Sequence, residues 1–292
     1  MSFSDYIALT KPKIIPLLLM VGFGSAFIAA RGLPPILTVF GVVISGAVAS
    51  AGALALNSYL EIDVDSKMRR TMNRPLPSQR IVPAAHALAI GLGLLAIGVA
   101  IAIATLNALA TFFIGLGAII YVPIYTIWLK PRTSWNIVLG GFAGSCAALA
   151  GWYAVGGVNL TSQGFTYAWI LAMLVFVWTP SHFWSLAVIT EQDYSSAGIP
   201  MLPSVIGSAA ASKYIVANTL LLIPVSLLLA FYLRGVGLWV YVLFTALFGV
   251  SLLWTNLKLL RSPTKANAWL AFKFSSPYLA VVFLVAMIAA VL

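Results

Sequence analysis

Apolar segments long enough to cross a lipid bilayer recur along the whole of this 292-residue chain. A membrane-spanning helix needs about 20 mostly apolar residues, and 62% of the chain is hydrophobic while only 8% is charged. This composition excludes an ordinary soluble domain. We count nine runs, at approximately 14 to 30, 36 to 60, 84 to 106, 109 to 128, 136 to 156, 166 to 189, 214 to 233, 237 to 256 and 269 to 291. The sequence therefore predicts an all-α polytopic membrane protein with about nine transmembrane helices, formed by residues 1–292 as a single domain.

The basic residues predict how these helices are oriented. If the N-terminus is cytoplasmic, thirteen Lys and Arg residues lie on the cytoplasmic side, while Arg31 and Arg234 lie outside and Lys273 lies within the last run. Such an excess of cytoplasmic basic residues is the usual determinant of membrane topology. We therefore expect the N-terminus inside and the C-terminus outside.

The acidic residues are few and clustered. The chain has six Asp and Glu residues, and five of them fall in two segments that follow the second and the sixth apolar run. They are Glu61, Asp63 and Asp65 in the first segment, and Glu191 and Asp193 in the second. In the predicted topology both segments face the cytoplasm, where they could line one cavity.

The first acidic segment has the spacing of a metal site. Residues four apart on a helix differ by about 40° in direction, so Asn57, Glu61 and Asp65 share an arc of roughly 80°. Two carboxylates on one face repel each other unless a cation lies between them. Oxygen donors without His or Cys suit Mg²⁺. On the same helix Asp63 would point the opposite way, so its role stays open.

Basic residues follow this segment closely: Lys67, Arg69, Arg70, Arg74 and Arg80. Acids that hold Mg²⁺ beside a set of Arg and Lys side chains are typical of a diphosphate-binding site. A solvated loop with mixed charges is the alternative. Lys130 and Arg132, in the next cytoplasmic loop, could contact the same diphosphate or could simply anchor the helix ends at the membrane surface.

The sixth run ends with a second group of polar and aromatic residues. His182 lies close to its end, and an ionisable side chain at membrane depth is a candidate functional residue. Pro180 predicts a kink, which frees backbone carbonyl groups. We expect His182 to handle a proton or to contact a ligand.

Three motifs together resemble the UbiA-type intramembrane prenyltransferases, and in particular the branch that farnesylates protohaem IX. The first is Asn57-x-x-x-Glu61-x-x-x-Asp65-x-x-Met68-x-Arg70-Thr71-x-x-Arg74-Pro75-Leu76. The second is Tyr125-Thr-x-Trp-Leu-Lys-x-Arg-Thr133-x-x-Asn136-Ile-Val-x-Gly-Gly141. The third is Trp178-x-Pro-x-His182-Phe183 with Asp193-Tyr194-x-x-Ala-Gly-Ile-Pro-Met-Leu-Pro203. The second part of the third motif and its Pro-x-His-Phe are specific to the haem branch.

The resemblance implies a UbiA-type helical bundle, with Mg²⁺ as the cofactor and haem b and an isoprenyl diphosphate as substrates. It implies transfer of a farnesyl or longer isoprenyl group to a vinyl group of haem b to make haem O. The metal ligands it implies are Asn57, Glu61, Asp65 and Asp193, and the catalytic residues are Asp65, Arg70, Arg74, Lys130 and Asp193. The substrate-binding residues it implies are Asn57, Lys67, Arg70, Arg74, Lys130, Arg132, Trp178, His182 and Tyr194.

The sequence departs from the superfamily pattern in two places. Glu61 stands where Asp is usual, and Ile189 stands four residues before Asp193 where many relatives have a second Asp, which leaves the coordination of a second ion open. A prenyltransferase for an aromatic quinone precursor or another lipid acceptor is the nearest alternative, and an anion transporter is a more distant one. Transporters place such acids near the bilayer midplane rather than at one face.

The resemblance also indicates where the protein works. We expect a multi-pass protein of a prokaryotic plasma membrane with its active site on the cytoplasmic side. The lipid bilayer is its environment and no nucleic acid is expected as a partner. Haem A synthase or a terminal oxidase is a possible partner, because either would use the product.

Overall fold

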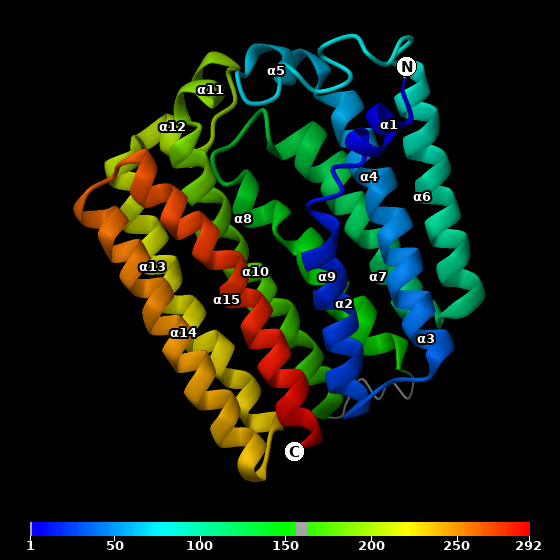
Figure 1. Cartoon of the computed structure of the whole chain (residues 1–292), viewed down its shortest axis with the longest axis vertical. Helices are drawn as coiled ribbons and strands as arrows, with labels where there is room; N and C mark the ends of the chain where they lie inside the picture. Colours follow the sequence, from blue (N-terminus) through cyan, green and yellow to red (C-terminus); the bar gives the residue numbers. More distant parts are fainter. Residues whose placement is uncertain (1, 156–162) are drawn as a thin grey trace.

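The computed structural model describes residues 2–155 and 163–292, and throughout these ranges every regular element is a helix. The long helices run side by side through one bundle, and short helices gather at one end of it (Figure 1). The expectation of an all-α membrane protein is confirmed. The elements are α1 (Phe3–Leu9), α2 (Ile15–Ala30), α3 (Ile36–Phe40), the π-helix η1 (Gly41–Ser45), α4 (Gly46–Leu60), α5 (Ile62–Lys67), α6 (Ala85–Thr105), α7 (Ala108–Ile119), the π-helix η2 (Ile120–Leu129), α8 (Asn136–Gly140), α9 (Phe142–Ala154), α10 (Gln163–Ile189), α11 (Glu191–Ser196), α12 (Leu202–Ile206), α13 (Ser208–Leu227), the 3₁₀-helix η3 (Leu228–Tyr232), α14 (Gly235–Arg261) and α15 (Lys265–Val291).

The number of crossings differs in one respect from the nine runs counted in the sequence. In the part of the chain that the structure describes, eight continuous helical stretches are long and apolar enough to span a membrane. The remaining run forms α2, whose 16 residues fall slightly short of the length that a crossing usually needs. The two termini lie at opposite ends of the bundle (Figure 1), as an odd number of crossings requires. The count of nine, and the sidedness of the termini, stay predictions.

Close backbone contact between α4 and α6 fixes the position of α4. A Cβ atom added to Gly52 would lie 2.4 Å from the backbone nitrogen of Leu95, and one added to Gly98 would lie 2.4 Å from that of Ala49. Lipid offers no hydrophobic driving force for helix association, so helices in a membrane associate through close packing, which small residues allow. Asn57 follows Gly52 by five residues on α4, so this contact holds it in place against the bundle.

The helix α9 is one of the most buried elements of the bundle. Its residues from Cys146 to Ala154 are buried, apart from the partly exposed Ala147, and they pack with apolar side chains of α2, α7 and α10. The closest approach is at Gly151, where an added Cβ atom would lie only 1.9 Å from the carbonyl oxygen of Gly22. This packed centre gives the flanking helices a rigid support.

Short helices and a long loop form a cap over one end of the bundle. The cap comprises α1, α5, α11 and α12, with the loop from 68 to 84 (Figure 1). Met68, directly after α5, is buried in a cluster that also contains Tyr194 of α11 and Met201. Burial of these side chains joins the loop that follows the second apolar run to the loop that follows the sixth. The two acidic segments therefore meet in the same cap.

Candidate active site

The first acidic segment keeps its four-residue spacing across a break between two helices. The helix α4 ends at Leu60, and Glu61 has φ −105° and ψ 16°, after which α5 begins. The N–H of Glu61 still donates to the carbonyl of Asn57 at 3.1 Å, and the N–H of Asp65 donates to that of Glu61 at 2.7 Å. As a result Asn57, Glu61 and Asp65 are all buried while Asp63 is exposed. The three side chains lie on the inner side of the segment.

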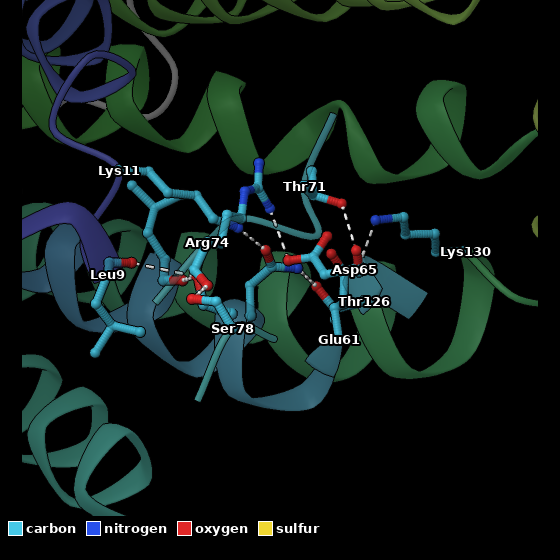
Figure 2. Close-up of polar contacts among 12 residues, drawn as sticks. Leu9, Lys11, Glu61, Asp65, Thr71, Arg74, Ser78, Thr126 and Lys130 are labelled. Atoms are coloured by element: carbon cyan, nitrogen blue, oxygen red, sulfur yellow. Dashed lines mark hydrogen bonds and ion pairs between the residues drawn. The ribbon is translucent and has the colours of Figure 1, made fainter. Parts of the chain in front are cut away.

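Each of these three side chains contacts a basic side chain from elsewhere in the chain. Figure 2 labels Glu61 and Asp65 with the basic residues Lys11, Arg74 and Lys130 around them. The ammonium group of Lys130 forms an ion pair and a hydrogen bond with Oε1 of Glu61. Arg74 donates from Nη1 to Oδ2 of Asp65 at 2.8 Å. The ammonium group of Lys11 donates to Oδ1 of Asn57 at 2.5 Å. Three oxygen donors and three cations thus form one connected site.

A π-helix places the residues that face α4 from the other side. In η2 the backbone lacks one donor at Pro123, and the N–H of Lys130 donates to the carbonyl of Tyr125, five residues earlier, at 2.8 Å. The hydroxyl of Thr126 donates to the carbonyl of Tyr121 and accepts a hydrogen bond of 2.9 Å from the amide of Asn57. Single π turns inside helices are frequent at functional sites. Here the wider turn brings Thr126 and Lys130 to the acidic segment.

Lys11 is the site residue that the sequence did not indicate. It follows α1, whose Leu9 is 2% exposed and packs on the cap, and whose Asp5 pairs with Arg80 at 2.9 Å. In the sequence Lys11 counted only as one of the basic residues that orient the first helix. Its position one residue before Pro12, at the start of an apolar run, is the only signal the sequence offers. The contact joins residues 46 positions apart, which no local pattern encodes.

The site holds more positive than negative charge. Burial, together with repulsion by Arg74, lowers the pKa of Lys11 to about 7. Burial also opposes the charged form of Lys130, but the Glu61 carboxylate outweighs it and raises the pKa of that side chain above its ordinary value. Three basic side chains therefore surround two carboxylates, and Lys11 is charged in only part of the molecules near pH 7. An anion that entered the site would relieve this imbalance.

The second acidic segment joins the first through backbone contacts. Oδ2 of Asp193 accepts a hydrogen bond of 3.2 Å from the backbone N–H of Arg70. The hydroxyl of Ser196 donates to the carbonyl of Lys67 at 3.4 Å. Glu191 is bonded instead to the hydroxyl of Ser208 at the start of α13. Of the two acids in this segment, Asp193 is the one that lies against the first segment, and Tyr194 beside it is buried.

Several of the predicted substrate-binding residues lie elsewhere or point to solvent. Lys67 and Arg70 are exposed on the cap. Arg132 is also exposed, and its Nη1 donates to the carbonyl groups of Ile127 and Trp128 at the end of η2. This contact caps a helix end, so Arg132 is held away from the acidic segments in this conformation.

Trp178 and His182 lie in an aromatic stack between α10 and α15. The His182 ring stacks on Trp178 at 4.4 Å and on Phe272 at 4.6 Å between centroids. Its Nδ1 is 2.5 Å from the hydroxyl oxygen of Ser275, whose carbonyl accepts a hydrogen bond from the Trp178 indole at 2.8 Å. Both side chains are buried and take part in the packing of α10 on α15. They take no part in the cluster around Asn57, Glu61 and Asp65.

The donor set fits Mg²⁺ better than a transition metal. Within residues 2–155 and 163–292, no three His, Cys, Asp or Glu side chains gather as a metal cage. The cluster offers one amide and two carboxylate oxygens, with Asp193 nearby on the second segment. Mg²⁺ prefers oxygen and usually takes one or two protein carboxylates, with water and substrate phosphates completing its shell. The residues present fit that pattern.

Comparison with known proteins gives a consistent result. A model of the UbiA prenyltransferase family matches residues 17–289. Protoheme IX farnesyltransferase 1 of Cenarchaeum symbiosum (strain A) is 44% identical over 288 residues, which cover 97% of this chain and 94% of that protein. A solved structure reported for digeranylgeranylglyceryl phosphate synthase in membranes has a TM-score of 0.77 at 19% identity and covers 99% of this chain and 98% of its own. A UbiA homolog from Archaeoglobus fulgidus bound to GPP and Mg²⁺ has a TM-score of 0.66 at 16% identity, with coverage of 96% and 99%.

Proposed function

The chain belongs to the UbiA prenyltransferase family, and we propose on this basis that it transfers an isoprenyl group to protohaem IX. The donor is farnesyl diphosphate or a longer homologue, the acceptor is a vinyl group of haem b, and the product is haem O. The acceptor follows from the relative named Protoheme IX farnesyltransferase 1, which aligns over 97% of the chain. We propose that residues 1–292 form one catalytic domain.

The observation that supports binding of the isoprenyl diphosphate is the row of three oxygen ligands that face three basic side chains. Asn57, Glu61 and Asp65 would hold Mg²⁺, with Asp193 contributing from the second segment. When bound, Mg²⁺ neutralises charge on the diphosphate and makes it a better leaving group. Arg74 and Lys130 would bind the diphosphate oxygens directly. Such electrostatic stabilisation of a leaving group is commonly the largest contribution to catalysis.

Two further basic residues are proposed to act from the cap. Lys67 and Arg70 are exposed close to Asp193, and we propose that they bind the entering diphosphate. Arg132 would join them only after leaving the carbonyl groups it now caps. We propose that Trp178 and His182, which lie between α10 and α15, help to bind the haem acceptor. We propose that Tyr194 contributes to substrate binding because it lies beside Asp193.

The proposed reaction is balanced as follows. The carbon–oxygen bond of the allylic diphosphate breaks, and its electron pair leaves with the diphosphate. The vinyl group of haem b supplies the electron pair for the new carbon–carbon bond. Water then adds to the adjacent cationic carbon and releases a proton, which leaves a hydroxyalkyl chain. The protein's own part is to bind the diphosphate, hold the allylic carbon beside the vinyl group and admit one water.

The setting of the reaction is a membrane. The chain is a multi-pass membrane protein, and both proposed substrates combine an apolar body with an anionic end. We propose the plasma membrane of a prokaryote, with the cap and its basic residues on the cytoplasmic side. Haem A synthase or a terminal oxidase is the proposed partner that uses the product.

The test is to identify the pigment product. Purified full-length protein in detergent is incubated with haem b, farnesyl diphosphate and Mg²⁺, and the haem products are separated and weighed by mass spectrometry. We expect a haem whose mass has increased by one farnesyl group and one hydroxyl group. Removal of Mg²⁺ by EDTA should abolish the product, and restored Mg²⁺ should recover it.

A matched pair of variants locates the site. Asp65→Ala removes a buried carboxylate of the cluster, whereas Asp63→Ala removes an exposed one two residues away. We expect Asp65→Ala to lose the product and Asp63→Ala to retain it. Prenylation of a quinone precursor in place of haem would support the diphosphate site but contradict haem b as the acceptor. Equal activity of the two variants would contradict the proposed site.

A further inference from the structure

Each candidate metal ligand of the first acidic segment already contacts a cation of the protein, and the three cations come from three separate parts of the chain. Lys130 follows η2, Arg74 lies in the loop after α5, and Lys11 lies between α1 and α2. We propose that Lys11 is a third diphosphate-binding residue, and that its ammonium group leaves the Asn57 oxygen for the diphosphate when the magnesium complex enters. This inference rests on the proposed function.

The contact of Lys11 with Asn57 and a magnesium ion on Asn57 disfavour each other. Mg²⁺ lies at about 2.0–2.1 Å from its oxygen ligands, and the Lys11 nitrogen is 2.5 Å from the only oxygen of the Asn57 side chain. A divalent ion at that oxygen would lie close to the ammonium group in a buried site, where repulsion is strong. Glu61 and Asp65 each use one carboxylate oxygen for Lys130 or Arg74 and keep the second oxygen for a metal. Binding of the metal therefore displaces Lys11 first.

An exchange of partners keeps the site close to electrical balance. The two carboxylates gain a divalent cation. The three basic side chains gain a diphosphate, which carries up to three negative charges as an ester. Without the substrate the site has three basic side chains for two carboxylates. The magnesium complex of a diphosphate is thus a ligand that every group in the site can pair with.

The N-terminal segment holds Lys11 close to the site while leaving its side chain able to move. Leu9 is buried in the cap, its carbonyl accepts a hydrogen bond from the hydroxyl of Ser58 at 3.2 Å, and Asp5 pairs with Arg80. Lys11 itself has φ +49°, a left-handed conformation that is uncommon for a residue with a side chain. Strained backbone of this kind persists where the surroundings enforce it, often at functional sites.

A small pocket lies beside this segment. It is lined by Ala8 and Leu9 from the N-terminal side and by Asp65 and Arg74 from the site, with Ser58, Pro75, Leu76 and Pro77 completing the wall. The long, flexible Lys11 side chain reaches Asn57 from a backbone that borders the same region. A modest rotation of its side-chain bonds could therefore transfer the ammonium group from the amide oxygen to a neighbouring anion.

Two binding measurements with opposite expected signs test the proposal. In Lys11→Met the side chain keeps its length but loses its charge. Mn²⁺, used as a spin-active substitute for Mg²⁺, should bind this variant roughly threefold to tenfold more tightly than wild type in the absence of diphosphate, because its competitor is gone. Farnesyl diphosphate, measured in saturating Mg²⁺, should bind roughly tenfold more weakly, because one cation is lost.

The controls separate this role from a structural one. Lys13→Met changes an exposed lysine two residues away and should leave both affinities unchanged. Lys11→Arg restores the charge and should bring both affinities back toward wild type. If Lys11→Met does not fold, Lys11→Gln serves in its place. A general structural defect would weaken both ligands together and would overturn the proposal, as would no change in either.

The outcome for the wild type keeps this inference apart from the proposed function. If wild-type protein fails to bind farnesyl diphosphate with Mg²⁺ present, the proposed function itself is overturned. If wild type binds it but Lys11→Met shows no opposite shifts, the function stands and the exchange at Lys11 is wrong.

Discussion

The two acidic segments lie in the same cap but are built differently. In the first, Glu61 and Asp65 are buried and each is paired with a basic side chain. In the second, Glu191 and Asp193 are partly exposed, and within the described residues neither forms an ion pair. Their hydrogen-bond donors are the hydroxyl of Ser208 and a backbone N–H.

This difference indicates a division of roles. Burying a carboxylate is costly unless it is paired, so Glu61 and Asp65 need a cationic partner whether or not a ligand is bound. In the second segment the carboxylates are partly exposed, so solvent stabilises their charge and they are free to approach a ligand. We infer that the first segment determines whether the magnesium diphosphate binds and that the second adjusts how well it is held.

The largest effect is expected from breaking one ion pair of the first segment. Lys130→Met leaves Glu61 buried without its cation, and loss of one partner of a buried pair typically costs about 3–5 kcal/mol. Denaturant unfolding in detergent should show this loss. The double variant Glu61→Gln/Lys130→Met removes both charges and should recover most of the stability. Equal destabilisation in the single and double variants would mean that the pair contributes little.

The direct comparison of the segments uses the same substitution in each. Asp65→Asn should lower the rate of transfer by about 10²–10³-fold, the range seen when a major electrostatic contact of an active site is lost. The side chain keeps its size, so the fold should be retained. A rate within a few-fold of wild type would contradict the central place we give to this carboxylate.

Asp193→Asn should have a smaller effect. We expect about a tenfold loss in kcat/KM, mostly through a higher KM for the diphosphate, in the range found for groups that support a metal site. Steady-state kinetics at varied farnesyl diphosphate concentration measure the split. A loss as large as that of Asp65→Asn would show that both segments hold the metal equally, and our comparison would be wrong.

The smallest effect is expected at Glu191. Its contact is with the hydroxyl of Ser208, on the side of α11 that faces α13. Because Glu191 contacts no residue of the cluster around Asn57, Glu61 and Asp65, Glu191→Gln should leave kcat/KM within about twofold of wild type, and the free energy of unfolding should change by less than about 0.5 kcal/mol. A tenfold loss at this position would instead place Glu191 in the site and reopen its role as a second metal ligand.

Much of the fold and part of the candidate site follow from the sequence. Apolar runs of membrane-spanning length predict the helices, because backbone groups in lipid must be paired within the helix. The four-residue spacing of Asn57, Glu61 and Asp65 predicts that they share one side, and the structure buries all three together while Asp63 is exposed. Periodicity carries this information because it depends only on neighbouring residues.

Other features were not accessible in this way. The contact of Lys11 with Asn57 joins residues 46 apart, and that of Lys130 with Glu61 joins residues 69 apart. His182 is stacked on aromatic rings of its own helix and of α15, and Arg132 caps a helix end. The binding roles expected of both residues stay predictions. Each outcome depends on which helices pack together.

That the chain is a helical membrane protein with two acidic segments can be read from its sequence, since helix length, charge bias and residue spacing are local properties of the chain. Which basic side chain contacts which oxygen donor depends on how the helices pack. The close packing of α4 on α6 and the π turn of η2 place these partners. The physical reason is that a buried charge is stabilised by whatever group packing brings within a few ångströms of it, and packing is set by the whole bundle.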